Sequence, residues 1–173
     1  MELTDGTIRL RRLRESDLRG IVAACDDPET ARFIPGMPSP YTDDDAREYL
    51  MSCDQAWQTR ERLPFAIVDL DGERLLGAID LRPGEHGSIG YWVARDARGA
   101  GVATRALILL SRWAVLEGGV ERLELTTHPE NRASQRVAEK AGFVREGVLR
   151  SHLRFRDGRR DSVLFSLLPA DVG

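Results

Sequence analysis

The chain has 173 residues, of which 42% are apolar, and its formal net charge is −3. A chain of this length fits a single domain spanning residues 1–173, with enough apolar residues for one continuous core. The slight acidic excess lacks the positive charge needed to neutralise a nucleic-acid backbone, so we expect no nucleic-acid partner.

The two cysteines, Cys25 and Cys53, have neither zinc-ligand nor thioredoxin-like spacing. We therefore expect reduced, buried thiols, no metal, and a cytoplasmic location. Residues 1–13 alternate polar and apolar side chains without the apolar core of a signal peptide, and no run approaches the roughly 18 apolar residues of a membrane helix. Neither secretion nor a membrane partner is expected.

The first part of the sequence predicts one strand and two helices. Residues 7–13 alternate apolar and charged side chains, which is typical of a strand, and capping groups for a short helix follow. The prolines from Pro28 to Pro40 predict turns. Thr42 precedes Asp45 by three residues, as in a capping box, so a second helix is expected over 43–60.

The rest of the sequence predicts alternating strands and helices. Three strand-like runs occupy residues 63–68, 74–81 and 88–94, and Asp71-Gly72 suits a tight hairpin between the first two. The remaining expected elements are a helix at 102–117, a strand at 122–127, a helix at 131–140 and two strands around residues 157–158. This order predicts a mixed α/β fold, with helices packed on one sheet.

A glycine turn, Arg98-Gly99-Ala100-Gly101-Val102-Ala103-Thr104, lies between a predicted strand and a predicted helix. Backbone N–H groups and the positive end of the helix dipole converge at such a junction and favour a phosphate. Gly99 and Gly101 allow left-handed angles and a close approach to a diphosphate, while Ala103 keeps the first helical turn thin. The turn matches neither a P-loop nor a dinucleotide fingerprint, and a junction without any ligand is the alternative.

Arg98, Gly101 and Ala103 match the Arg/Gln-x-x-Gly-x-Gly/Ala signature of GNAT acetyltransferases. The runs Ile89–Val93 and Asn131–Phe143 resemble the RimJ/RimL branch of ribosomal-protein N-terminal acetyltransferases. The resemblance implies a GNAT fold, a mostly antiparallel seven-stranded sheet that splays between strands 4 and 5 and is packed by about four helices. It also implies that the glycine turn binds the pyrophosphate of acetyl-CoA, the co-substrate.

The same resemblance implies roles for residues around the thioester. Backbone groups of Tyr91, Trp92 and Val93 would contact the pantetheine arm, with the Val93 N–H stabilising the developing oxyanion. Asn131 would hydrogen-bond the pantetheine, and Ser134, one helical turn further, would steady or protonate the departing thiolate. The simpler alternatives are a core strand, a helix N-cap and an exposed helix serine.

The sequence does not single out the base that deprotonates the acceptor amine. Members of the branch often carry a glutamate just before the Ile-Gly-Tyr-Trp segment, whereas this chain has Ser88. His152, on a predicted closing strand, is our candidate because an imidazole titrates near neutral pH. Glu124 is a second candidate. For both, an ordinary surface or packed position is the alternative, and water could relay the proton instead.

The acceptor amine is expected near residues 26–62, where acidic side chains at 26–29 and 43–45 could attract a cation. The alternative is that these acids only stabilise helix starts through the helix dipole. Trp57 and Phe33 suit either the acceptor cleft or the core. We expect the acceptor to be a peptide or protein N-terminal α-amine. The alternatives are a small-molecule amine (polyamine, antibiotic or amino acid) and a non-catalytic acyl-CoA-binding module. The resemblance also suggests a homodimer without specifying an interface.

Overall fold

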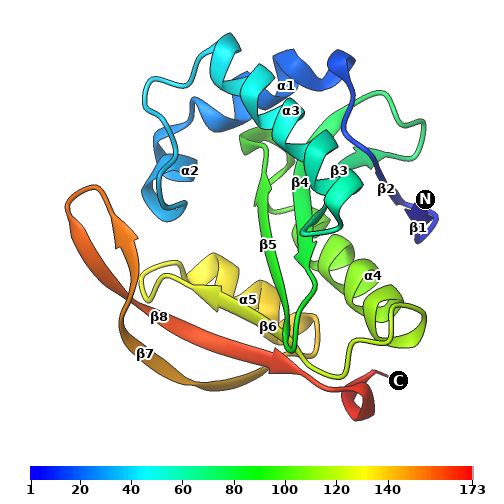
Figure 1. The fold of residues 1–173 in the computed structure, drawn as a ribbon, viewed down its shortest axis with the longest axis vertical. Helices are drawn as coiled ribbons and strands as arrows, with labels where there is room; N and C mark the ends of the chain where they lie inside the picture. The colour runs from blue at the N-terminus through cyan, green and yellow to red at the C-terminus, as the bar shows by residue number, and fades with distance from the viewer. Residues whose placement is uncertain (173) are drawn as a thin grey trace.

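The computed structural model describes residues 1–172, and its centre is one eight-stranded sheet in the order β1-β2-β3-β4-β5-β6-β8-β7 (Figure 1). The strands are β1 (Leu3–Thr4), β2 (Ile8–Arg11), β3 (Leu63–Asp69), β4 (Leu75–Arg82), β5 (Gly87–Val93), β6 (Leu123–Thr127), β7 (Val144–Phe155) and β8 (Gly158–Leu167). All neighbouring pairs are antiparallel except β5 and β6, which are parallel. The predicted mixed α/β fold is confirmed.

Five α-helices within residues 1–172 cover the sheet: α1 (Leu18–Cys25), α2 (Pro28–Phe33), α3 (Asp43–Thr59), α4 (Val102–Leu116) and α5 (Arg132–Lys140). Strand β3 shows how the sheet separates two apolar clusters, because successive side chains of a strand point to opposite faces. Phe65 and Ile67 pack in the cluster that contains α4, whereas Ala66 and Val68 pack with α1 and α3. Helices therefore cover both faces.

The sheet has one strand more than the seven expected, and the helices are one more than the expected four. In the added strand β1, the chain reverses at Gly6, and Asp5 Oδ1 accepts hydrogen bonds from the N–H groups of Thr7 and Ile8 at 2.8 and 2.9 Å. The added helix α2 lies where prolines predicted turns, because Pro28 occupies the first helical turn, where its missing N–H costs nothing.

Strands β5 and β6 pair only where they begin. Gly87 pairs with Leu123 and Ser88 with Glu124, and the two strands then diverge (Figure 1). Strand β5 meanwhile remains paired with β4 at six successive positions, from Ser88 to Val93. The resemblance predicted an opening between strands 4 and 5, and it lies between β5 and β6 because β1 adds one strand to the count.

A buried ion pair joins β2 to the segment before α1. Arg11 is 2% exposed and Asp17 is 3% exposed, and two hydrogen bonds of 2.8 Å connect the guanidinium to the carboxylate. The Arg11 guanidinium also donates to the Gly72 carbonyl at 3.1 and 3.3 Å. Asp17 Oδ2 accepts the Arg14 N–H at 2.8 Å. One buried charge pair thus connects β2, the start of α1 and the β3–β4 hairpin.

Replacing Arg11 by Met should lower the free energy of unfolding by about 3–5 kcal/mol, because the Asp17 carboxylate stays buried without its counter-charge. The control Arg47→Met removes the arginine of the exposed Arg47–Asp44 pair and should cost less than about 0.5 kcal/mol. Urea denaturation followed by circular dichroism measures both. A loss below about 1 kcal/mol for Arg11→Met would show that the buried pair does not have the expected role.

Candidate active site

A cleft of about 1150 Å³ opens where β5 and β6 diverge. Its lining combines Ser134 of α5 and Tyr49 of α3, which belong to helices on opposite faces of the sheet. The glycine turn, α2, α3, α5 and the β7–β8 hairpin all contribute to its lining. The cleft therefore passes through the sheet at the opening.

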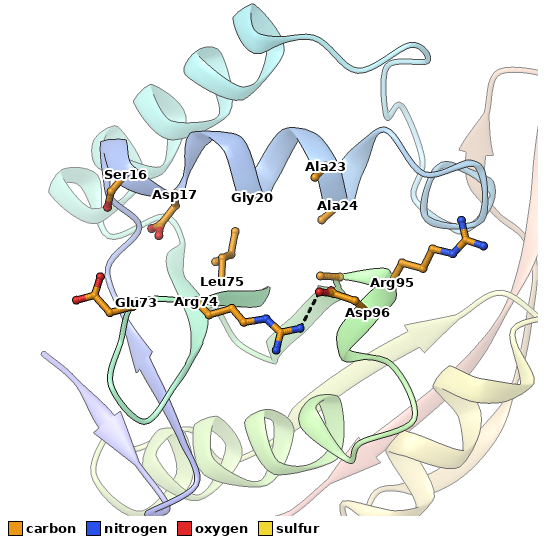
Figure 2. A pocket seen from close by; sticks show the side chains of 11 residues that line it. Ser16, Asp17, Gly20, Ala23, Ala24, Glu73, Arg74, Leu75, Arg95 and Asp96 are labelled. Carbon is orange, nitrogen blue, oxygen red and sulfur yellow. Dashed lines mark hydrogen bonds and ion pairs between the residues drawn. The ribbon is translucent and has the colours of Figure 1, made fainter.

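A smaller hollow of about 680 Å³ lies beside α1, and Figure 2 shows its side chains. Arg74 and Asp96, both more than half exposed, pair with each other there at 2.6 Å. Helix α1 packs closely at Gly20, where a Cβ would lie 3.0 Å from Leu75. None of the site residues predicted from the sequence lines this hollow, so we place the chemistry in the larger cleft.

The glycine turn forms one wall of the cleft, immediately before α4. Gly99 and Gly101 both have φ of +77°, and a Cβ built on either would meet no atom within 4 Å. The turn therefore has the left-handed backbone that glycine allows, with open space beside it. Six of the seven predicted residues line the cleft, and Ala100 does not. The open space and the start of a 15-residue helix fit linked phosphates.

The Arg98 side chain is held by neighbouring protein groups. Its Nη2 donates to Asp27 Oδ2 at 2.6 Å and to Thr30 Oγ1 at 2.7 Å, and its Nε donates to the Val93 carbonyl at 3.2 Å. Although burial opposes ionisation, hydrogen bonds from Arg98 and Thr30 hold the pKa of Asp27 below its usual value. Arg98 thus connects the glycine turn to α2 and to the end of β5.

Strand β5 directs alternate N–H groups toward the opening. The Ala94 N–H donates to the Leu76 carbonyl on the β4 side, and the Gly87 N–H donates to the Arg122 carbonyl on the β6 side, both at 2.9 Å. N–H directions alternate along a strand, so the N–H groups of Tyr91 and Val93 point to the β6 side. In residues 1–172 the pairing of β5 with β6 ends at Ser88, before either residue.

Trp92 differs from its two neighbours on β5. Its backbone faces β4, where it is in register with Ala78, and its side chain lines the cleft. The structure therefore directs the N–H groups of Tyr91 and Val93 toward the opening and uses the backbone of Trp92 within the sheet.

The hydroxyls of Tyr91 and Ser134 meet across the opening in a hydrogen bond of 2.8 Å. Asn131 caps α5, because its Oδ1 accepts the Ser134 N–H at 3.0 Å, and this contact fixes where Ser134 lies. Burial raises the pKa of Tyr91 to about 12, and the hydrogen bond with Ser134 opposes this rise. Two protonated hydroxyls therefore adjoin each other in the cleft at neutral pH. A role for the Tyr91 hydroxyl was not predicted from the sequence, which pointed only to the backbone of this residue.

His152 lies on a bulge of β7 and is exposed. Ser151 has a φ of +54°, and its N–H donates to Asp161 Oδ1 at 2.7 Å. His152 Nδ1 is 3.1 Å from Ser162 Oγ. Ser162 and Asp161 line the cleft, whereas His152 is not among the lining residues, so the imidazole lies behind Ser162.

The acidic residues considered from the sequence have mainly local partners. Glu124 pairs with Arg122 at 2.8 Å and does not line the cleft. Thr42 is the N-cap of α3, and its hydrogen bonds lower the pKa of Asp45, its partner in the capping box. Among the acids at 26–29 and 43–45, Glu29 and Asp45 line the cleft.

Three aromatic rings meet in the wall of the cleft. The His128 ring lies 5.6 Å from Phe33 and 5.9 Å from Phe155, measured between ring centroids, and all three residues line the cleft. Trp57 instead packs against Phe65 in the core. The two aromatic positions left open by the sequence are thereby assigned, Phe33 to the cleft and Trp57 to the core.

Residues 7–144 match the family model of the acetyltransferase (GNAT) domain. The chain belongs to this family. It is 29% identical to the probable N-acetyltransferase YjcK of Bacillus subtilis over 136 residues, which cover 76% of this chain and 75% of YjcK. As a member of the GNAT family, the protein described here is an acetyl-CoA-dependent acyltransferase.

Two solved structures extend the comparison. RimJ of Mycobacterium smegmatis in complex with CoA-disulfide has a TM-score of 0.88 and 25% identity, and the match covers 99% of this chain and 89% of RimJ. RimL, a ribosomal L7/L12 α-N-protein acetyltransferase in complex with coenzyme A, has a TM-score of 0.84 and 17% identity, with 96% of each chain covered. The second likeness concerns the fold alone.

Two further observations concern the chain as a whole. Cys25 and Cys53 are free, buried thiols, as expected, and burial raises the pKa of Cys25 to about 12. Within residues 1–172, no helix has the length and apolar character needed to cross a membrane, and no cluster of three metal-binding side chains is present.

All three tyrosines should remain protonated in the folded protein until the pH is well above 10. Burial raises the pKa of Tyr91 to about 12 and also raises those of Tyr41 and Tyr49. Ultraviolet titration should therefore show no phenolate below about pH 11 in the folded protein, and three phenolates forming near about pH 10 in urea. The Tyr91→Phe variant should lack the first native phase. A tyrosine that ionises near pH 10 in the folded wild type would contradict this burial.

Because the folded pKa values exceed the unfolded ones, these phenols stabilise the fold fully below about pH 10. That contribution is lost as the pH rises through the folded values. The free energy of unfolding should therefore begin to fall above about pH 10, as urea titrations at several pH values would show.

Proposed function

We propose that the enzyme transfers the acetyl group of acetyl-CoA to the N-terminal α-amine of a peptide or protein, by direct attack within a ternary complex. The observation that carries the proposal is the β5–β6 opening, where the glycine turn, the Tyr91 and Val93 N–H groups and the Ser134 hydroxyl share one cleft. The CoA complex of RimJ, which has the same fold, supports coenzyme A as the ligand.

In this proposal, the turn from Arg98 to Thr104 and the first N–H groups of α4 bind the linked phosphates of acetyl-CoA. Arg136 and Lys140 of α5 line the same cleft and would add positive charge near these phosphates. Arg98 acts mainly by holding the turn, because Asp27, Thr30 and the Val93 carbonyl already engage its guanidinium. Asn131 would contact the pantetheine while it caps α5.

The Val93 N–H, which points into the opening, would donate to the thioester oxygen as that oxygen gains negative charge. The C–N bond forms while the C–S bond breaks, so the departing sulfur needs a proton. Either hydroxyl of the Ser134–Tyr91 pair can donate within their hydrogen bond, so Tyr91 can replace a proton that Ser134 gives to sulfur. His152 has the least support among the predicted catalytic residues, because it is exposed and lies behind Ser162.

The aromatic part of the cleft wall supports a peptide acceptor. Phe33, His128 and Phe155 offer apolar surface, and Glu48 and Asp161 add negative charge, a combination suited to an ammonium group with an adjoining side chain. RimL is described as an acetyltransferase of a protein α-amine. A small-molecule amine is the alternative and would bind against the same wall of the cleft. Buried free thiols support the cytoplasm as the compartment.

The phosphate site is tested by Gly101→Trp, which should weaken acetyl-CoA binding at least about 100-fold in calorimetry, because the indole fills the open space beside the turn. The matched control is Gly119→Trp: Gly119 also has a positive φ, of 69°, and open surroundings, but it does not line the cleft. Equal affinity in the two variants would contradict the proposed site.

Ser134→Ala tests the proton donor separately. It should bind acetyl-CoA within about threefold of wild type and lower kcat about 10- to 100-fold, because one hydroxyl of the donor pair is lost. Thiol release measures turnover with pooled peptides that carry free or acetylated N-termini and with pooled small amines. The free peptides should be the best substrates. Turnover of the small amines alone would contradict the peptide acceptor.

A further inference from the structure

Asp80 of β4 is a largely buried carboxylate in the wall of the cleft. Its side chain is 12% exposed, and it stands in register with Gly90 of β5. A Cβ built on Gly90 would be in contact with Asp80 Oδ1, at 3.5 Å, and with Arg82 Nη1, at 3.6 Å. Asp80 and Gly90 both line the cleft, and Oδ1 itself is buried between them.

The two oxygens of Asp80 have different surroundings. Oδ2 accepts hydrogen bonds from Arg62 at 3.2 Å and from Arg82 at 3.3 Å. Oδ1 has no hydrogen-bond partner among the side chains and backbone of residues 1–172, although Arg82 Nη1 lies 3.2 Å away without suitable alignment. A buried acceptor without a donor costs free energy, so a bound N–H or O–H group would be favourable at Oδ1.

The groups around Asp80 favour a carboxylate with increased proton affinity. Burial raises its pKa above the usual value, although Arg82, Arg62 and the backbone N–H of Gly90 oppose the rise. Tyr49 and Cys53 of α3 also face it, and burial raises the pKa of each, so both are neutral. From β5, Gly90 and Ser88 bring no charge. A carboxylate with a raised pKa is better suited to accepting a proton near neutral pH.

We propose that Asp80 Oδ1 takes a proton from the substrate amine. One bound water passes this proton from the amine to the carboxylate. The inference rests on the proposed function and assigns the base that the sequence left open. Gly90, opposite Asp80, precedes Val93 by three residues, or roughly 10 Å along the strand, so the amine and one water span the distance to the thioester.

The proton balance follows from an acceptor that arrives as an ammonium ion. One proton passes from nitrogen to the water, and a proton of that water passes to Asp80 Oδ1, which later releases it to solvent. The freed lone pair forms the C–N bond as the C–S bond breaks. Nitrogen then loses its second proton, which replaces the proton that the Ser134–Tyr91 pair gives to sulfur. Overall, the ammonium ion and acetyl-CoA give the N-acetylated amine, the free thiol of coenzyme A and one proton.

The test compares wild type with Asp80→Asn, using saturating acetyl-CoA and a peptide with a free N-terminal alanine, whose amine has a pKa of about 8. In the wild type, Asp80 takes the proton of the substrate ammonium group and holds it during the attack. The value of kcat/KM should therefore change little from pH 6 to pH 8. In Asp80→Asn only amine that is already neutral reacts, so kcat/KM should rise about 50-fold from pH 6 to pH 8 as the neutral fraction grows. The ratio between the two enzymes should therefore fall about 50-fold over this range.

Asp54→Asn is the matched control, because it removes the same charge from an exposed position of α3 outside the cleft. It should keep the wild-type profile. Gly90→Ala is a second variant that retains Asp80 and places a methyl group in contact with Oδ1, and it should lose more activity at pH 6 than at pH 8. This variant decides the question if Asp80→Asn does not fold.

Parallel pH profiles of wild type, Asp80→Asn and Gly90→Ala would overturn the inference, whatever the overall loss, because a purely structural ion pair with Arg62 and Arg82 affects all pH values alike. An active wild type with parallel profiles contradicts the role of Asp80 alone. A wild type that acetylates neither the peptide nor the pooled amines contradicts the proposed function and this inference together.

Discussion

The backbone of β5 has two hydrogen-bonding edges, and the protein uses only one of them along most of the strand. One edge pairs with β4 up to Val93, whereas the other pairs with β6 only at its start. Buried N–H groups require partners, so the unpaired edge is a row of donors that a bound chain can satisfy. The cleft, the position of α5 and the proposed oxyanion contact all depend on this divergence.

Several contacts keep β5 in place beside the opening. Gly77 of β4 allows a close approach, because a Cβ there would lie 2.3 Å from the Trp92 carbonyl. Arg98 holds the Val93 carbonyl and, through Asp27, the α2 segment. One guanidinium thus connects the proposed phosphate site to α2, the helix that carries Phe33. Backbone packing and the Arg98 guanidinium together fix the geometry of the cleft. A fixed cleft is well suited to hold two substrates next to each other.

The order of the elements could be predicted from the sequence because each depends on local signals. The capping box at Thr42 and Asp45 marks α3, and the glycines at 99 and 101 mark the turn before α4. Helix α2 was missed, although Asp27 before Pro28 is a helix-start signal that could have revealed it. Contacts between distant segments gave no local signal. The partner of Arg98 is 71 residues away in sequence, and the relation of Asp80 to Gly90 appears only in the strand register.

Amide hydrogen exchange of β5, followed by NMR, tests the central claim most directly. Saturating acetyl-CoA should slow exchange at Tyr91 and Val93, whose N–H groups face the opening, and leave Gly90 and Trp92, which face β4, nearly unchanged. Exchange at Gly101 and Val102 should slow as well. Unchanged exchange at Tyr91, Val93 and the glycine turn with bound acetyl-CoA would contradict a co-substrate held along the free edge of β5.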